Sequence, residues 1–204
     1  MNIKIVSYNS VMLYFEQLIS EEVLDEVQTT YLKLKELDGV IDITPSYCSI
    51  LLIYDIFMYD YKSIQKAIIE RCSVEVVSNN KKSNKIIKIP TDYTNNLDLE
   101  RVADYNNLSI EEVIEMHTQT TYRVYAIGFM VGFAYLAKVD SKISTPRLET
   151  PRKKVPQGSV AIADNQTAIY PQESAGGWNI IGHTQFNQFY EFCVGDRVAF
   201  VSVR

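Results

Sequence analysis

The sequence has little of several things that mark common classes of protein. Among 204 residues there are two histidines and three cysteines, and Cys48, Cys72 and Cys193 stand far apart. An odd number of widely spaced cysteines argues against a disulfide framework or a paired-cysteine zinc site. The sequence contains no HExxH motif, no serine in a nucleophile-elbow context and no phosphate-binding GxxxxGK[ST] loop. We therefore expect no metal and no self-sufficient catalytic centre in this chain.

A basic surface and a membrane-spanning segment are missing as well. The formal net charge is −5 and the pI is near 5.1, whereas nucleic-acid binders usually present a basic face. No run approaches the ~18 apolar residues that a membrane helix needs, and no secretory leader is recognisable. With 47% hydrophobic residues the composition is that of an ordinary globular protein. We expect a cytoplasmic protein that binds neither nucleic acid nor membrane.

Residues 1–84 alternate between strand and helix patterns. Period-2 alternation predicts two strands around a turn at Asn9-Ser10, and Ser20 is placed to cap a helix that Gly39, just past Leu37, would end. These patterns predict a small two-layer α+β domain. Further strands are expected at 40–43, 49–56 and 74–77, a second helix at about 62–72, and a polar linker at 79–85.

Residues 85–204 are predicted to form a second, mostly β domain. Two short helices come first, and Ser109 and Glu112 have the spacing of a capping box at the start of the second one. From Tyr122 onward strand patterns dominate. The first helix is expected at about 97–105, and strands at 86–90, 160–163, 168–170, 179–182 and 197–203.

The segment from Gly128 to Gly182 holds six of the eight glycines. Glycine supplies positive φ and proline fixes φ, so the segment is typical of short strands joined by demanding turns. We expect a turn with a buried indole at Gly176, Gly177 and Trp178, and another turn motif at Gly128 and Gly132. In order, the blocks are GFMVGFAYL, TPR, PR, VPQGSVAIA, QTAIYP and SAGGWNIIG.

These ordered blocks resemble the allophanate hydrolase subunit 1 family, which includes the B-type subunit of 5-oxoprolinase and an inhibitor of a sporulation histidine kinase. The resemblance runs from Gly39 to about Val198 and so covers most of the chain. It implies a cyclophilin-like β-barrel after the α+β domain. It also implies ATP-dependent conversion of 5-oxoproline to glutamate, with ATP bound by a complex and not necessarily by this chain. The implied partners are a subunit-2-type protein, similar to the C-type subunit of 5-oxoprolinase, and a lactam-hydrolase-like A-type subunit.

The sequence is compatible with two other functions. A binding protein that inhibits a histidine kinase would need an exposed apolar patch on the second domain. A role in urea or allophanate metabolism is suggested by the family name, although the serine-rich amidase signature is missing. The chain also departs from the family pattern at its turns, where Val131, Ala168 and Ala175 replace proline or glycine and Asp164-Asn165 replaces a glycine pair. It is therefore a divergent copy whose catalytic partnership could be altered.

His117 and the two Pro-Arg dipeptides are the first candidates for a shared pocket. His117 ends a predicted helix, where the dipole would raise its pKa, and it is either a buried structural histidine or, as the family match suggests, a pocket residue. Arg147 and Arg152 each follow a proline that pins the backbone. Each could grip a carboxylate or phosphate through two hydrogen bonds, or instead bond to backbone carbonyls at the surface.

Three further candidates come from the strands. Strand alternation places Gln166 and Tyr170 on one face, where they could line a polar pocket, although Tyr170 could equally close a barrel end. Tyr125 belongs to the Tyr-x-Val-Tyr run that the family shares. No catalytic base or nucleophile can be assigned. The candidate set is therefore His117, Tyr125, Arg147, Arg152, Gln166 and Tyr170.

Overall fold

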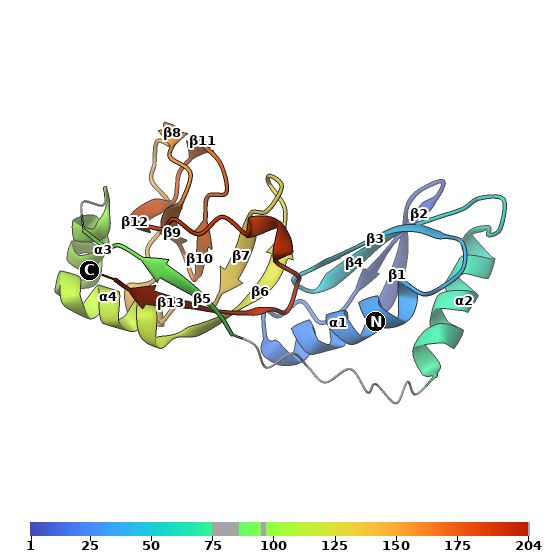
Figure 1. Ribbon diagram of the computed structural model, residues 1–204. Helices are drawn as coiled ribbons and strands as arrows, with labels where there is room; N and C mark the ends of the chain where they lie inside the picture. Colours follow the sequence, from blue (N-terminus) through green and yellow to red (C-terminus); the bar gives the residue numbers. More distant parts are fainter. Residues whose placement is uncertain (75–85, 95–96, 204) are drawn as a thin grey trace. The chain divides into compact units, whose positions relative to one another are not determined.

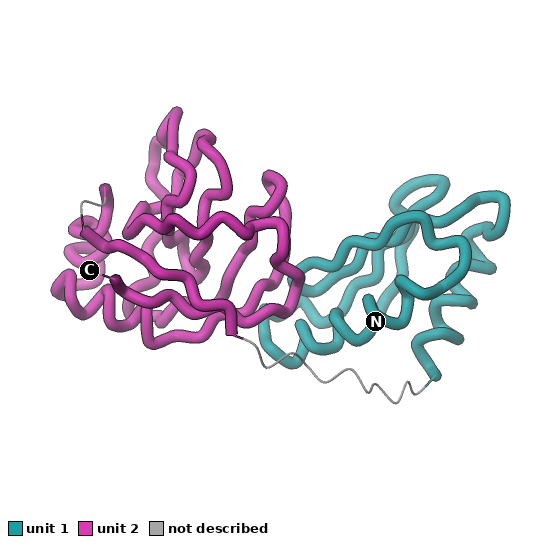
Figure 2. The backbone as a smooth tube through the Cα atoms, in the orientation of Figure 1, with its two compact units in different colours: residues 1–82 teal, residues 83–204 magenta. Residues whose placement is uncertain are grey.

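The computed structural model describes residues 1–74, 86–94 and 97–203. The chain forms two compact units, residues 1–82 and 83–204 (Figure 2), where the sequence placed a boundary between 84 and 85. The linker expected at 79–85 lies outside the described residues, as does all but the first residue of the strand expected at 74–77.

The first unit is a four-stranded sheet with two helices (Figure 1). The strand order β1-β2-β4-β3 is antiparallel throughout, and β4, the apolar run, lies inside the sheet. Leu13 and Leu52 are fully buried in one cluster with Val27 and Ile64 of the helices, so the predicted two layers are present. The elements are β1 (Asn2–Ser7), β2 (Ser10–Tyr14), α1 (Glu21–Leu34), β3 (Val40–Ser46), β4 (Ser49–Tyr54) and α2 (Tyr61–Ser73).

Helix α1 begins as predicted and ends earlier than predicted. The Ser20 hydroxyl accepts a hydrogen bond from the Val23 N–H at 3.3 Å, which caps the helix. The helix stops at Leu34, so Gly39 is not its stop signal. Gly39 instead has φ +77° in the turn before β3, and a Cβ there would lie 2.8 Å from the Tyr59 ring. Its role is a turn conformation and close packing that only glycine permits.

The second unit is a seven-stranded sheet that curls into a nearly closed barrel (Figure 1), which confirms the α+β class. The strand order is β12-β9-β10-β7-β6-β13-β5, and the two outer strands meet where Asp92 and His183 exchange two hydrogen bonds of 2.8 Å. Only β13 and β5 pair in parallel among these strands. The elements are β5 (Ile86–Thr91), α3 (Leu99–Asn106), α4 (Ile110–Gln119), β6 (Thr121–Ile127), β7 (Ala134–Ala137), β9 (Ser159–Ala163), β10 (Gln166–Ile169), β12 (Asn179–His183) and β13 (Arg197–Ser202).

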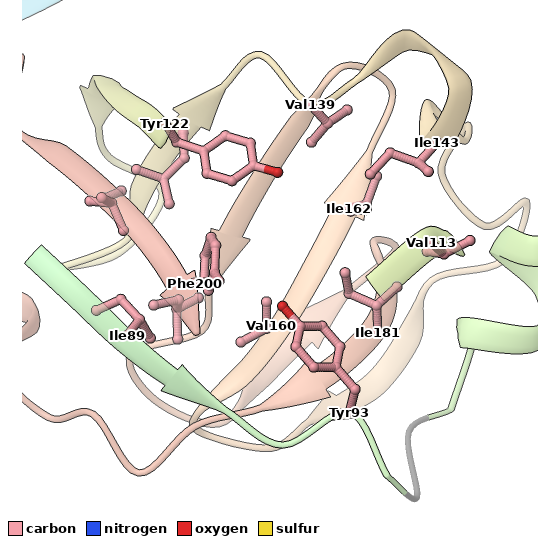
Figure 3. Close-up of a cluster of buried hydrophobic side chains, with 14 of the residues drawn as sticks. Ile89, Tyr93, Val113, Tyr122, Val139, Ile143, Val160, Ile162, Ile181 and Phe200 are labelled. Atoms are coloured by element: carbon pink, nitrogen blue, oxygen red, sulfur yellow. The ribbon is translucent and has the colours of Figure 1, made fainter. Parts of the chain in front are cut away.

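Apolar side chains fill the inside of this barrel (Figure 3). Val160 and Ile162 of β9 meet Phe200 of β13 there, and the cluster extends to Val113 of α4. A second apolar cluster, with Tyr170 and Trp178, includes Ala161 and Ala163, which alternate with the inward residues of β9. Because neighbouring strand residues point to opposite faces, this second cluster lies on the outer face of the barrel.

Two short strands stand out from the barrel as an arm that the sequence did not predict (Figure 1). Strand β8 (Arg152–Val155) pairs antiparallel with β11 (Ser174–Gly176) and with no other strand of the described residues. We call these two strands the β8–β11 arm. Single turns η1 (Ser141–Ile143) and η2 (Phe189–Glu191) complete the elements of this unit.

The capping box of α4 is present in full and gives a first testable prediction. Ser109 Oγ accepts from the Glu112 N–H at 3.2 Å, and Glu112 Oε2 accepts from the Ser109 N–H at 2.8 Å. Ser109→Ala should lower the free energy of unfolding by about 1 kcal/mol, because the box loses its side-chain acceptor at the helix end. Urea denaturation followed by circular dichroism measures this. The control Ser141→Ala, at an exposed serine, should change it by under about 0.5 kcal/mol, and equal values for the two variants would contradict the prediction.

Candidate functional site

Three of the predicted pocket residues come together on the outer face of the barrel. Arg147 and Arg152 both act electrostatically on the Tyr170 hydroxyl. Burial raises the pKa of Tyr170, and a hydrogen bond with the Trp178 backbone and the two cations oppose that rise. Tyr170 itself is 1% exposed, so it supports this surface from below.

Arg147 is an exposed cation on an aromatic wall. Its guanidinium carbon lies 5.7 Å from the ring centroid of Trp178, which is buried. The wall continues through Tyr135, whose ring packs edge-on against Trp178 at 5.9 Å, and Phe133, at 5.7 Å from the same indole. Cations within about 6 Å of an indole face are attracted by its quadrupole.

The backbone on both sides of Arg147 is fixed. The Pro146 carbonyl accepts a hydrogen bond from Asn179 Nδ2 at 3.0 Å, and the Leu148 N–H donates to the Gly177 carbonyl at 2.7 Å. Asn179 is fully buried, and its side chain also donates to the Ile162 carbonyl at 3.1 Å and accepts from Arg101. The guanidinium of Arg147 is thus carried by a rigid segment.

Arg152 has a different role from the one predicted. Its two terminal nitrogens donate to both carboxylate oxygens of Asp98, at 2.9 and 2.6 Å. Asp98 is 4% exposed and also accepts from the Ile180 N–H at 2.7 Å. A guanidinium that is already bound by a buried carboxylate has little left for an external anion, so the interpretation of Arg152 as an anion holder is corrected. It begins strand β8 and ties the β8–β11 arm to the barrel.

Asp98 was missed in the sequence. It occupies the N-cap position of α3, the usual place for an aspartate, yet its side chain makes no capping hydrogen bond. Its partner Arg152 is 54 residues away in the chain. Asn179 and Tyr135 were missed for the same reason, because nothing local to either residue reveals a distant partner.

His117 lies inside the barrel, away from the outer face. It is fully buried, with Nδ1 hydrogen-bonded to the Tyr93 hydroxyl at 2.7 Å and Nε2 to the Thr167 hydroxyl at 2.9 Å. Burial lowers its pKa to about 3, which is opposite to the rise predicted from the helix dipole. Desolvation outweighs the dipole here. Thr167 points inward while the next residue, Ala168, belongs to the outer cluster, so the sheet separates His117 from Arg147.

The other predicted residues are placed as follows. Tyr125 is 2% exposed on β6, and Gln166 is partly exposed at the start of β10, opposite Ala163. Gln166 is about 13 Å along the strand from Tyr170, at ~3.3 Å per residue. The Gly128–Gly132 turn joins β6 to β7, where the Gly128 N–H donates to the Phe133 carbonyl at 3.1 Å.

The indole of Trp178 is buried as predicted, whereas the backbone before it is the end of strand β11 followed by a bend at Trp178. Gly176 is the last residue of β11 and lies against the Tyr170 hydroxyl, where a Cβ would be 2.2 Å from that oxygen. Gly177 follows and bonds to Leu148. Gly176 and Gly177 therefore link the arm to both Tyr170 and the Arg147 segment.

Within the described part of the chain, no group of three or more His, Cys, Asp or Glu side chains could hold a metal ion. No helix of that part is long and apolar enough to cross a membrane.

This barrel, its arm and the preceding sheet domain define a family of carboxyltransferase-type domains. The family described as carboxyltransferase domain, subdomain C and D, matches residues 1–192, and the chain belongs to this family. The chain is 33% identical over 195 residues to the B-type subunit of 5-oxoprolinase from Bacillus subtilis, which covers 89% of this chain and 81% of that protein. It is 46% identical over 101 residues to the corresponding 5-oxoprolinase subunit of Haemophilus influenzae, or 48% of this chain and 47% of the relative. The resemblance drawn from the motifs is confirmed.

Solved structures agree with this fold. The crystal structure of TTHA0988 matches with a TM-score of 0.83 and 30% identity, covering 97% of this chain but 40% of that one. The present chain thus spans well under half of that protein. A conserved uncharacterized protein from Pyrococcus horikoshii matches with a TM-score of 0.57 and 38% identity, covering 99% and 97% of the two chains. Urea carboxylase of Kluyveromyces lactis, at 15% identity and a TM-score of 0.72 over 96% of this chain and 21% of its own, shows a likeness of fold alone.

Proposed function

We propose that this chain is the B-type subunit of an ATP-dependent 5-oxoprolinase, which converts 5-oxoproline to glutamate. The names of the relatives support a subunit role in such an enzyme. The structural observation that carries the proposal is Arg147, an exposed guanidinium held over Trp178 on a fixed segment. Such a group suits an anionic substrate at a surface that another polypeptide completes.

The chemistry proposed for this chain is binding and orientation. A lactam is a poor electrophile, so its opening needs fixed electrostatic support and a site from which water is excluded. His117, the one histidine in the predicted pocket, is buried with both ring nitrogens hydrogen-bonded, and we assign it no proton transfer. The catalytic base is therefore proposed to come from another protein of the complex.

ATP is proposed to bind to the assembled complex. When bound there, it supplies the free energy for opening an unreactive amide. Of the two Pro-Arg residues, Arg152 is already held by Asp98 and only Arg147 is exposed. The described residues thus fit one anionic group better than a polyphosphate, and we assign no ATP contact to this chain.

The proposed partners are a subunit-2-type protein, like the C-type subunit of 5-oxoprolinase, and a lactam-hydrolase-like A-type subunit, in the cytoplasm. Co-expression of the chain with both should give a complex that hydrolyses ATP only when 5-oxoproline is added, and glutamate should appear in proportion. The control is the same preparation without this chain, which should lose the activity. A well-folded, complete complex without 5-oxoproline-dependent ATP hydrolysis would overturn the proposal.

One observation favours a second function, inhibition of a histidine kinase. Phe129 and Val131, at the tip between β6 and β7, are 64% and 74% exposed. They form the kind of apolar projection that binds a protein partner. Pull-downs with a kinase core and with the subunit-2-type protein separate the two functions, because retention of the kinase alone would favour inhibition.

A further inference from the structure

The geometry points to Arg147 as the group that recognises the carboxylate of a small lactam acid, with the ring of that ligand lying beside Tyr135. Arg152 acts as a positioning residue for this surface and does not touch the ligand. This inference rests on the proposed function, since it names the part of 5-oxoproline that the chain binds.

The two arginines have the same local sequence and different surroundings. Both follow proline, yet Arg152 forms a two-pronged ion pair with Asp98 whereas Arg147 is exposed. Within the described residues Arg147 has no acidic partner, and its contact is the Trp178 ring at 5.7 Å. A guanidinium that lies over a ring keeps its edge N–H groups for a planar acceptor such as a carboxylate. Arg147 is therefore the arginine of the pair that is available to an external anion.

The support under Arg147 reduces the cost of binding. The hydrogen bonds at Pro146 and Leu148 fix the backbone on both sides of it, so less conformational freedom is lost when the side chain meets an anion. The Arg152–Asp98 pair anchors the start of the arm, and the Gly176 end of the arm lies against Tyr170. The segment between Arg147 and Arg152 is thus fixed at both of its ends.

The aromatic wall beside Arg147 defines the rest of the ligand. Tyr135 is partly exposed, and Phe133 packs behind it at 4.9 Å. A small ring carrying a carboxylate would place the ring beside the partly exposed Tyr135 and its charge on Arg147. 5-Oxoproline carries its carboxylate on the ring carbon next to the lactam nitrogen, so its ring methylenes can face Tyr135 while the carboxylate meets Arg147 and the amide keeps its hydrogen bonds.

The test in the assembled enzyme separates the KM for 5-oxoproline from kcat. Arg147→Ala should raise KM by about tenfold or more with kcat changed by less than about threefold, because the lost interaction binds ground state and transition state alike. Arg147→Lys keeps the charge without the two-pronged geometry. Its KM should therefore lie between those of wild type and Arg147→Ala. The control Lys66→Ala, at an exposed lysine of α2, should leave both constants unchanged. A KM within about twofold of wild type for Arg147→Ala overturns the inference.

Binding is also measurable without the partners, because Trp178 is the chain's single tryptophan. Titration of the full chain with 5-oxoproline should change the indole fluorescence to a plateau. Titration with 2-pyrrolidinone, the same lactam without the carboxylate, should not, and Arg147→Ala should abolish the response to 5-oxoproline.

The two measurements separate this inference from the proposed function. An inactive complex with a saturable response to 5-oxoproline would overturn the enzyme assignment and leave the carboxylate site in place. An active complex whose KM is unchanged by Arg147→Ala would support the enzyme assignment and overturn the carboxylate site. An acetylated glutamyl peptide that changes the fluorescence where 5-oxoproline does not would overturn the small-molecule inference in favour of a partner's side chain. An inactive complex with no response to any of these ligands overturns both.

Discussion

Asp98→Ala is expected to lower the free energy of unfolding by about 3 kcal/mol, because it leaves the guanidinium of Arg152 and the Ile180 N–H without their acceptor. The figure lies at the low end for broken buried pairs because the Arg152 side chain is 28% exposed while that of Asp98 is 5% exposed. Urea denaturation measures the change. Arg152→Ala and the double variant complete a cycle that isolates the pair itself.

The same arm supplies a matched control. Lys154 and Glu173 form an ion pair of 3.1 Å with side chains 77% and 57% exposed. Lys154→Ala should cost less than about 1 kcal/mol, because exposed pairs are well solvated in both states. If Asp98→Ala costs no more than Lys154→Ala, the pair does not anchor the arm in the way we describe.

The second large effect is a pH dependence that comes from His117. Burial lowers the pKa of His117 from 6.5 to about 3. Between pH 6.5 and pH 3, His117 is therefore protonated in the unfolded chain and neutral in the folded chain. Its contribution is complete above pH 6.5 and is lost as the pH falls, by about 1.4 kcal/mol per pH unit, or about 2 kcal/mol at pH 5. Nothing in this contribution changes above pH 7.

His117→Gln should remove this loss while keeping a side chain able to bond to Tyr93 and Thr167. The measurement is the unfolding free energy of wild type and variant from pH 7 to 4.5, and their difference cancels the carboxylates common to both. Ser141→Ala, at an exposed serine that does not titrate, should leave the slope equal to that of wild type. Should His117→Gln fold poorly, His117→Asn gives the same comparison, and a slope equal to that of wild type in the folded variant would refute the prediction.

The sequence predicts the structure correctly where a feature depends on residues close together in the chain. Ser20 and Ser109 cap their helices because a cap is a hydrogen bond within three residues of the chain. The apolar run of β4 predicted an inner strand, and β4 lies between β2 and β3 with fully and partly buried side chains in alternation. The prediction of a barrel came from the family resemblance and not from the periodicity of the sequence.

The predictions that were wrong concern properties set by residues distant in the chain, such as the pKa of His117 and the role of Arg152. The rise predicted for the pKa of His117 comes from its own helix, whereas the fall comes from desolvation by the rest of the barrel around a fully buried ring. Arg152 could not be told from Arg147 in the sequence, because the difference lies in Asp98. Asp164 is an intermediate case, since the turn keeps a φ of +51° where the family pattern has glycine, a conformation that aspartate tolerates better than most residues.

The parallel pairing of β5 with β13 constrains the order in which the second unit can fold. Strand β5 finds its parallel partner in β13, in register from Ile86 with Arg197 to Thr91 with Ser202. During translation β5 therefore leaves the ribosome long before the strand that covers it, and its edge stays open while more than a hundred residues are added. Residues 1–82 contain all the strands of their own sheet and can fold ahead of it. We expect newly synthesised chains to pass through an intermediate in which residues 1–82 are folded and β13 has not yet paired with β5.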